Sequence, residues 1–240
     1  WLVYTVDSAD NVGLYTSLVL DQDTLIGDIP TAHIAYFDET NDNLKYAVGA
    51  DGAFAKEIVN STGSVGTYSS IALNSSGIPR ISYFDLINQD LLYAVRLGSN
   101  NWSSVKIATT GDVGFFSSLV VDSYGNPHIA YFDDDNDDLK YAYFNGLYWR
   151  YQTVDTSKST GWYISLALDT NNRAHISYHD FTNGDLKHAV WTGSAWMIEI
   201  VDGIGSVGQY TSIFLDKSNR SHIFYYDTTN LRLKYAAGLD

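Results

Sequence analysis

Short runs of apolar and β-branched residues, separated by Gly, Asn and Asp, follow one another along the whole chain. Between residues 116 and 154 these runs predict four strands, at Phe116–Val121, His128–Asp133, Leu139–Phe144 and Tyr148–Val154. Asn145-Gly146, between the last two, is a strong hairpin signal, because a type I′ turn needs two residues with positive φ. No long helical period interrupts the runs, so the pattern predicts an all-β protein.

This unit of four strands, which we call a to d in chain order, recurs five times. A Tyr-x-Asp triplet marks the end of strand b, and its tyrosines follow one another at intervals of 47, 48, 47 and 47 residues. The triplets are Tyr36–Asp38, Tyr83–Asp85, Tyr131–Asp133, Tyr178–Asp180 and Tyr225–Asp227.

Three further features recur in step with the triplet. Strand c begins with a leucine: Leu44, Leu91, Leu139, Leu186 and Leu233. A Gly and a Ser four residues apart accompany strand a: Gly13/Ser17, Gly66/Ser70, Gly114/Ser118, Gly161/Ser165 and Gly208/Ser212. An aromatic residue marks strand d: Trp1, Phe54, Trp102, Trp149 and Trp196.

Repeats of about 40–50 residues, each of four strands, are typical of the blades of a β-propeller. The fifth copy ends after strand c, while the chain begins with a strand of type d, Trp1–Val6. A solenoid gives no reason for this circular offset, whereas in a ring the N-terminal strand pairs with the last blade and removes its open edge. The sequence therefore predicts one domain, residues 1–240, which is a five-bladed β-propeller of four-stranded antiparallel blades with the N-terminal strand completing the last blade.

One copy departs from the period. Ser17 and Tyr36 are six residues further apart than Ser70 and Tyr83. The extra residues lie near Asp23–Asp28, in the a–b turn of the first blade, and they are a candidate site for a protein partner.

Composition narrows the range of partners. With 28 acidic and 14 basic residues the net charge is −14, which disfavours nucleic acid and anionic membrane surfaces. No apolar run is long enough to enter and cross a membrane, and a chain without Cys has no disulfide and no thiolate metal site. Because the chain starts at Trp1 rather than Met, we expect a monomeric domain of a larger or processed chain.

In a propeller strand a is innermost, so the b–c and d–a loops share one face, and we expect ligands on that face. Its d–a loops carry one recurrent ring per blade, at Tyr15, Tyr68, Phe116, Tyr163 and Tyr210, and two further rings at Phe115 and Trp162. A flat ring beside amide and carboxylate groups suits a sugar, which has an apolar face and a hydroxyl edge. The recurrent rings fit a second interpretation equally well, in which they wedge neighbouring blades together. Phe115 and Trp162 do not recur, which favours a role at the surface.

The Asp residues that end strand b, namely Asp38, Asp85, Asp133, Asp180 and Asp227, also have two interpretations. They form one polar binding site per blade, or they cap the b–c turn by accepting backbone N–H bonds. We favour the structural role, because a residue needed by every blade is most simply explained by the blade. The same reasoning predicts a structural Asp–His–Ser network that includes the recurrent Ser and strand-b histidines His33, His128, His175 and His222.

Metal binding and catalysis have little support in the sequence. Asp133, Asp135 and Asp137 have the spacing of an EF-type calcium loop, but Asp138 stands at the position of the required Gly and Phe144 at that of the bidentate Glu. We interpret this run as a solvated acidic turn, with an adventitious cation site as the alternative. There is no unique acid pair on the innermost strands, as a glycosidase requires, and no nucleophile elbow or phosphate loop. The sequence predicts a protein that is not an enzyme and uses no cofactor.

Five repeats of this length with an aromatic residue on the outer strand resemble the tachylectin class of five-bladed propeller lectins in architecture. The resemblance implies a non-catalytic, carbohydrate-binding or adhesive module with repeated similar sites, located outside the cell or at its surface, whose partner is a glycan or another cell-surface ligand. The main alternative is a structural or protein-interaction domain of a larger extracellular protein, and a five-bladed glycoside hydrolase is the third interpretation.

Overall fold

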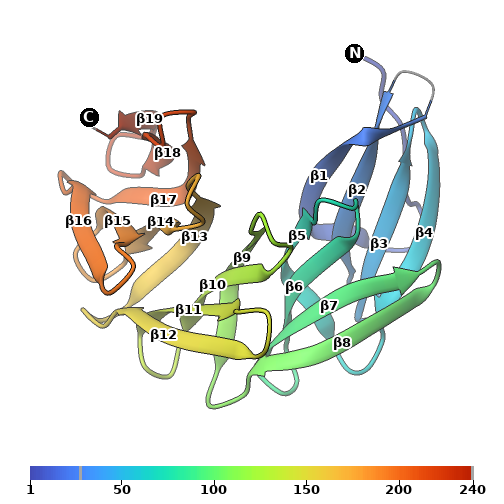
Figure 1. The fold of residues 1–240 in the computed structure, drawn as a ribbon, viewed down its shortest axis with the longest axis horizontal. Coiled ribbons are helices and arrows are strands. Elements are labelled where there is room, and N and C mark those ends of the chain that lie inside the picture. Colours follow the sequence, from blue (N-terminus) through green and yellow to red (C-terminus); the bar gives the residue numbers. More distant parts are fainter. Residues whose placement is uncertain (27–28, 239–240) are drawn as a thin grey trace. The chain divides into compact units, whose positions relative to one another are not determined.

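A computed structural model of the chain describes residues 1–26 and 29–238. In these residues all regular secondary structure is β, and the strands group into five antiparallel sheets (Figure 1). The sheets are the blades of a five-bladed β-propeller, which confirms the predicted fold class. No helix that could cross a membrane occurs in the described residues.

Each sheet takes its strands in chain order from a to d. Strand a is β1 (Val12–Ile26), β5 (Val65–Leu73), β9 (Val113–Val121), β13 (Thr160–Leu168) or β17 (Val207–Leu215). Strand b is β2 (Ile29–Asp38), β6 (Pro79–Asp85), β10 (Pro127–Asp133), β14 (Ala174–Asp180) or β18 (Ser221–Asp227). Strand c is β3 (Asn43–Ala50), β7 (Asp90–Gly98), β11 (Asp138–Phe144), β15 (Asp185–Trp191) or β19 (Arg232–Ala237). Strand d is β4 (Ala53–Asn60), β8 (Asn101–Ala108), β12 (Trp149–Asp155) or β16 (Trp196–Asp202).

The chain divides into two compact units, Trp1–Gly125 and Asn126–Asp240. In the first unit a core cluster joins Leu44 and Tyr46 of β3 to Val65, Ile81 and Tyr83 of the second sheet. In the second unit Leu186 of β15 packs in the same way against the last sheet. The core therefore lies between the faces of successive sheets. The prediction of one domain over residues 1–240 stays a prediction.

Burial explains why strands b and c read as apolar runs rather than as alternating patterns. All seven residues of β10 and all seven of β14 are buried, because both faces of these strands are covered. The outer strand β4 exposes half of its residues. Strand position in the blade thus decides how much of the sequence must be apolar.

Strand a begins about three residues earlier than predicted, because it starts with a bulge. In β17 the pairing with β18 shifts register around Gln209, and Tyr210 in the bulge has φ 52°. The recurrent rings all share this conformation, with φ of 50° at Tyr15, 52° at Tyr68, 53° at Phe116 and 54° at Tyr163. Positive φ is rare for bulky residues, so each blade holds one strained aromatic position.

The N-terminal segment is not a strand in this structure. The last sheet contains three strands, β17, β18 and β19, and no strand is assigned within Trp1–Asn11. Side chains hold the segment to the first blade instead. The hydroxyl of Tyr4 donates to Asp51 (2.6 Å), and that of Tyr36 donates to Asp7 (2.8 Å). A strand exists only where its backbone groups find a pairing edge, so completion of the last blade by Trp1–Val6 stays a prediction.

The insertion near Asp23–Asp28 lengthens the first a–b hairpin. β1 pairs with β2 as far as Ile26, which lies opposite Ile29. Residues 27 and 28, which include Asp28 of the predicted insertion, lie outside the described residues. Within the described residues the insertion therefore extends the two paired strands, with a register shift between Asp21 and Leu25.

Candidate ligand-binding face

The b–c turns and the d–a loops lie side by side, as predicted. The backbone N–H of Leu86 donates to the carbonyl of Ser64, and Phe181 donates in the same way to Ser159, both at 2.9 Å. Each bond joins the first residue of a b–c turn to the d–a loop before that blade. In these two blades the b–c turn is therefore joined to the d–a loop that precedes it.

The five recurrent Asp residues are buried in their own turns. Asp180 accepts the backbone N–H of Asn183 (3.0 Å), its side-chain amide (2.9 Å) and the ammonium of Lys187 (2.7 Å). The other four accept backbone and amide bonds in the same way, Asp38 from Asn41, Asp85 from Asn88, Asp133 from Asn136 and Asp227 from Asn230. These contacts support the structural interpretation of the recurrent Asp.

The predicted Asp–His–Ser network is wrong. The strand-b histidine bonds instead to an aromatic residue of strand c, as His33 does to the hydroxyl of Tyr46 (2.5 Å). The strand-a serine reaches the next blade, since Ser17 accepts the backbone N–H of Ile71 and Ser165 that of Ile213, both at 3.1 Å. Pairing across the sheet and packing between sheets decide these partners, and neither is visible in a repeat pattern.

The recurrent rings contact one another from blade to blade. The ring centroids of Tyr15 and Tyr68 are 4.8 Å apart, those of Tyr68 and Phe116 5.0 Å, and those of Tyr163 and Tyr210 4.5 Å. Such distances are those of packed aromatic pairs. The contacts support the second interpretation of these rings, in which they wedge neighbouring blades together.

The two rings that do not recur are both half-buried, and each packs on a buried Phe of the preceding blade, Phe115 on Phe84 and Trp162 on Phe132, whose centroid is 5.7 Å away. Phe115 lies 4.3 Å from the buried ring of Phe84 and 5.4 Å from Tyr68, so it extends the wedge between blades. Trp162 is stacked on Phe181, with centroids 4.9 Å apart and planes at 23°. Phe181 is 56% exposed and Trp162 is half-buried, so the apolar surface that the pair presents to solvent is mainly that of Phe181.

The loop beside this pair has unusual backbone geometry. Lys158 and Ser159 have φ of 69° and 45°. Positive φ recurs at the position of Lys158 in every blade, at Asp10, Gly63, Gly111 and Gly205, whereas among the described residues only this blade has positive φ at the position of Ser159. The carbonyl of Lys158 accepts the hydroxyl of Thr182 at 2.9 Å. Strained positions of this kind cluster at functional sites. We call Lys158, Ser159, Trp162, Phe181 and Thr182 the Trp162 site.

Sequence reasoning found Trp162 and missed Phe181. The signal was present, because the residue after the strand-b Asp is Glu39, Leu86, Asp134 or Thr228 in the other copies. An aromatic residue at this position is a departure from the repeat, as Trp162 is at its own position. Comparing the copies at the b–c turns would have identified the pair.

The fourth blade departs from the repeat at a second place. His188 replaces the strand-c tyrosine, so that the rings of His175 and His188 are stacked 5.3 Å apart. Burial, together with the charge of His188, lowers the pKa of His175 to about 4 against the opposing effect of Asp169. Burial also lowers the pKa of His188, although Glu199, 2.9 Å away, opposes this shift. Both histidines are therefore neutral at pH 7.

We expect the free energy of unfolding to fall as the pH drops from 6.5 to 4. An unfolded histidine takes up a proton in this window and the buried His175 does not, so the stabilisation is complete above pH 6.5 and is lost towards pH 4. This pKa difference corresponds to about 3 kcal/mol. His188→Tyr restores the pair found in the other blades and should reduce the loss. Urea unfolding at pH 7 and pH 4.5 gives the loss of unfolding free energy for the parent protein and for His188→Tyr. Equal losses in the two proteins would contradict the assignment of this pH dependence to the pair of His175 and His188.

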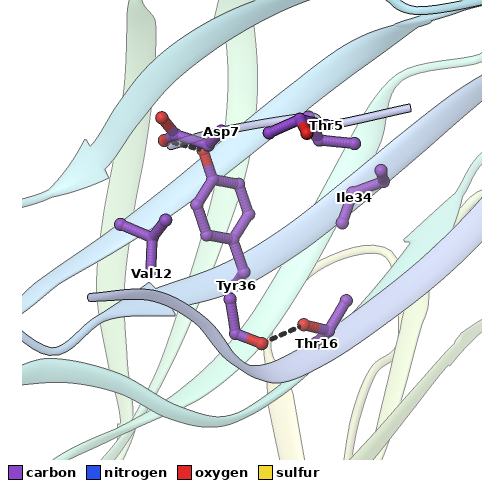
Figure 2. A pocket seen from close by; sticks show the side chains of 8 residues that line it. Thr5, Asp7, Val12, Thr16, Ile34 and Tyr36 are labelled. Carbon is purple, nitrogen blue, oxygen red and sulfur yellow. Dashed lines mark hydrogen bonds between the residues drawn. The ribbon is translucent and has the colours of Figure 1, made fainter. Parts of the chain in front are cut away.

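Two cavities lie away from the Trp162 site. One, of about 290 Å³, is enclosed by the N-terminal segment and strands β1 and β2 (Figure 2). Val12, Ile34 and Tyr36 are among the residues that line it, and the hydroxyl of Tyr36 donates there to Asp7. The other, of about 480 Å³, lies among β15, β16, β18 and β19 and includes His188 and Glu199. Neither contains a residue predicted to bind a ligand.

No family model and no curated protein matches the chain. Among solved structures it is similar to the lectin of Aleuria aurantia, a mutant in complex with α-methyl-L-fucoside, with 14% identity and a TM-score of 0.62, over 92% of this chain and 74% of the lectin. A protein of unknown function from Dyadobacter fermentans has 12% identity and a TM-score of 0.65 over the same shares. An ulvan lyase of polysaccharide lyase family PL25 has 13% identity and a TM-score of 0.61, over 88% and 64%.

At these identities the similarity shows the fold alone. The similar structures include both a lectin and an enzyme that acts on a polysaccharide, so they indicate what kind of scaffold this is rather than which chemistry it performs. The chain is an all-β, five-bladed propeller with a lectin-like fold.

Proposed function

We propose that the chain is a non-catalytic carbohydrate-binding module and that the Trp162 site is its main binding site. The observation that carries the proposal is the stacked pair of the half-buried Trp162, near the start of β13, and the exposed Phe181 in the b–c turn of the same blade. A sugar ring lays its apolar face on such a surface and directs its hydroxyls to polar groups at the edge. The exposed ammonium of Lys158 and the hydroxyls of Ser159 and Thr182 supply those groups.

Two further observations support a sugar as the ligand and argue for binding rather than catalysis. The Aleuria lectin, which shares the fold, is bound to a fucoside. The recurrent carboxylates of strand b are all engaged in their own turns, so they do not offer the pair of convergent acids that glycoside hydrolysis uses. In this proposal the protein acts as a monomeric module outside the cell or at its surface.

The proposal favours one strong site over five equal ones. The recurrent rings pack on each other and the recurrent Asp residues are buried, so the parts shared by all blades maintain the fold. Phe115, at the repeat position of Trp162 in the third blade, packs on Phe84, and the third blade has Asp134 at the repeat position of Phe181. Weaker binding at that second position would still raise avidity on a repetitive glycan surface.

We expect Phe181→Ala to weaken glycan binding about tenfold, because a stacked ring contributes about 1 kcal/mol or more beyond its burial. Trp162→Ala should have the same or a larger effect. A glycan array identifies the ligand, and calorimetric titration of that glycan gives the dissociation constants.

Tyr124→Ala is the matched control, since Tyr124 is an exposed aromatic residue in the a–b turn of the third blade. Its dissociation constant should equal that of the parent protein. Unchanged binding in the Phe181 and Trp162 variants would place the site elsewhere, and an array without any bound glycan would reject the ligand class.

A second candidate function is protein interaction through the extended first hairpin. Ile26 and Ile29, which pair across it, are both exposed. Exposed apolar residues on a unique extension suit a protein partner. Shortening the hairpin by removing residues 23–28 should abolish capture of such a partner and leave glycan binding unchanged.

A further inference from the structure

Two histidines and a serine form a buried polar cluster where the fourth sheet meets the last one. His188 of β15 lies opposite Ser177 of β14, so His175 is its diagonal neighbour on the same face of the sheet. Ser221 is the first residue of β18 in the last sheet. All three side chains belong to the unit Asn126–Asp240, and strand register together with packing of the two sheets brings them together.

The polar atoms of this cluster form a nearly equilateral triangle. Nδ1 of His175 lies 3.3 Å from Nε2 of His188, and Oγ of Ser221 lies 3.4 Å from each of these nitrogens. These separations exceed the usual range of hydrogen bonds, which is about 2.7–3.2 Å. Ligand atoms that lie about 2.0–2.1 Å from a tetrahedral Zn²⁺ are about 3.3–3.4 Å from one another. The triangle therefore has the dimensions of one face of a tetrahedral zinc site.

Glu199 determines which nitrogen of His188 is available to an ion. The two residues lie opposite each other on β16 and β15, and the carboxylate is 2.9 Å from Nδ1 of His188. A carboxylate accepts the ring N–H, so the proton lies on Nδ1 and the lone pair on Nε2 faces the triangle. Histidines that bind metals in proteins usually donate their second N–H to such an acceptor. Glu199 also supplies a negative charge beside the triangle.

The other blades fill the position of His188 with a tyrosine. Its hydroxyl bonds directly to the strand-b histidine, at 2.5 Å between His33 and Tyr46 and at 2.5 Å between His222 and Tyr235. An imidazole is shorter than a phenol, so the polar atoms of the fourth blade stand further apart. All three side chains of the cluster line the cavity of about 480 Å³, which gives an ion and its water a way in.

We propose that the imidazoles of His175 and His188 bind Zn²⁺ through the two facing nitrogens, with Oγ of Ser221 as a further ligand and water from the cavity at the fourth position. No group of three His, Cys, Asp or Glu side chains that could hold a metal ion occurs in the part of the chain that the structure describes. The two imidazoles therefore supply most of the affinity.

The bound ion joins the fourth blade to the last one. Because the unfolded chain does not hold these three side chains together, the ion binds the folded protein preferentially and stabilises it. His175 lies near the start of β14, whereas Phe181 follows the end of that strand. The zinc site and the Trp162 site are thus at opposite ends of β14, and this inference does not rest on the proposed function.

Titration of the untagged chain with ZnCl₂, after treatment with EDTA, tests the site. One ion should bind per chain, and the melting temperature should rise by about 5–10 °C at a zinc concentration about one hundred times the dissociation constant. Co²⁺ should compete with Zn²⁺ and give the visible absorption bands of a tetrahedral complex. Calorimetric titration gives the stoichiometry and the dissociation constants.

His188→Tyr is the decisive variant, because it introduces the residue that the other four blades carry. It should abolish the rise in melting temperature and the cobalt bands, and it should leave glycan binding at the Trp162 site unchanged. Ser221→Ala should bind zinc more weakly than the parent protein and more tightly than His188→Tyr. His33→Gln is the matched control, since His33 holds the strand-b position of His175 in the first blade and pairs with a tyrosine. It should bind zinc as the parent protein does.

A parent protein that shows neither a zinc-dependent rise in melting temperature nor cobalt bands would overturn the proposal, and so would a His188→Tyr variant that keeps both. Loss of zinc binding in His33→Gln, with binding kept in His188→Tyr, would place the ion in the first blade. An unchanged dissociation constant in Ser221→Ala would remove the serine from the set of ligands.

Discussion

Replacing Leu186 by Ala is expected to lower the free energy of unfolding by about 3 kcal/mol. Leu186 is fully buried among Val207, Ile213 and Tyr225, and its backbone lies against Gly208. The variant loses the burial of the removed carbons and leaves a cavity. The backbones of Leu186 and Gly208 are already in close contact, so they cannot move together to fill it. Urea unfolding at pH 7 measures the change.

Leu147→Ala is the matched control, because Leu147 is exposed in the c–d turn of the third blade. Its effect should stay within about 0.5 kcal/mol. Equal effects of the two substitutions would show that the contact of Leu186 with the next blade does not contribute the stability that the burial of Leu186 implies.

Replacing Lys187 by Met is expected to cost about 3–5 kcal/mol, because it leaves two buried carboxylates without their cation. The buried ammonium of Lys187 lies 2.7 Å from Asp180 and 3.2 Å from Asp155, and it donates to Ser157 at 2.8 Å. Burial raises the pKa of Asp155, but hydrogen bonds from Ser157 and Tyr178 and the charge of Lys187 lower it below its usual value. Asp155 is therefore ionised at pH 7 and needs its partner.

Lys56→Met is the control for this prediction. Lys56 is partly exposed and lies 3.5 Å from Asp7, which keeps its contacts with Lys45 and Tyr36. The loss should be below about 1 kcal/mol. If urea unfolding shows that both lysine variants lose the same small amount, the cluster around Lys187 is not the buried ion pair described above.

The fold was predictable because the five copies repeat every residue that the blade requires. The spacing of Tyr36, Tyr83 and their equivalents gave the number of blades, and the turns around Asn145-Gly146 gave the strands. Backbone conformation was not predictable in the same way. A tyrosine with positive φ, such as Tyr210, looks like any other strand residue in the sequence. The bulge that holds it is visible only in the pairing of β17 with β18.

The partners of polar side chains were predicted only where the contact is local. Asp180 caps its own turn, three residues from Asn183, and the expected turn chemistry holds. His33 bonds to Tyr46, 13 residues away across the hairpin, and a different network was predicted for it. At the candidate site, Trp162 was identified because it breaks the repeat. Phe181 breaks it too, but pairing the two rings required the fold.

The central claim is that a sugar lies on the Trp162 site, and a crystal structure with the glycan selected by the array tests it most directly. The prediction is density for a sugar ring parallel to Phe181, with its hydroxyls toward Lys158, Ser159 and Thr182. A glycan bound at another surface, or in either of the two cavities, with the ring of Phe181 left uncovered, would contradict it.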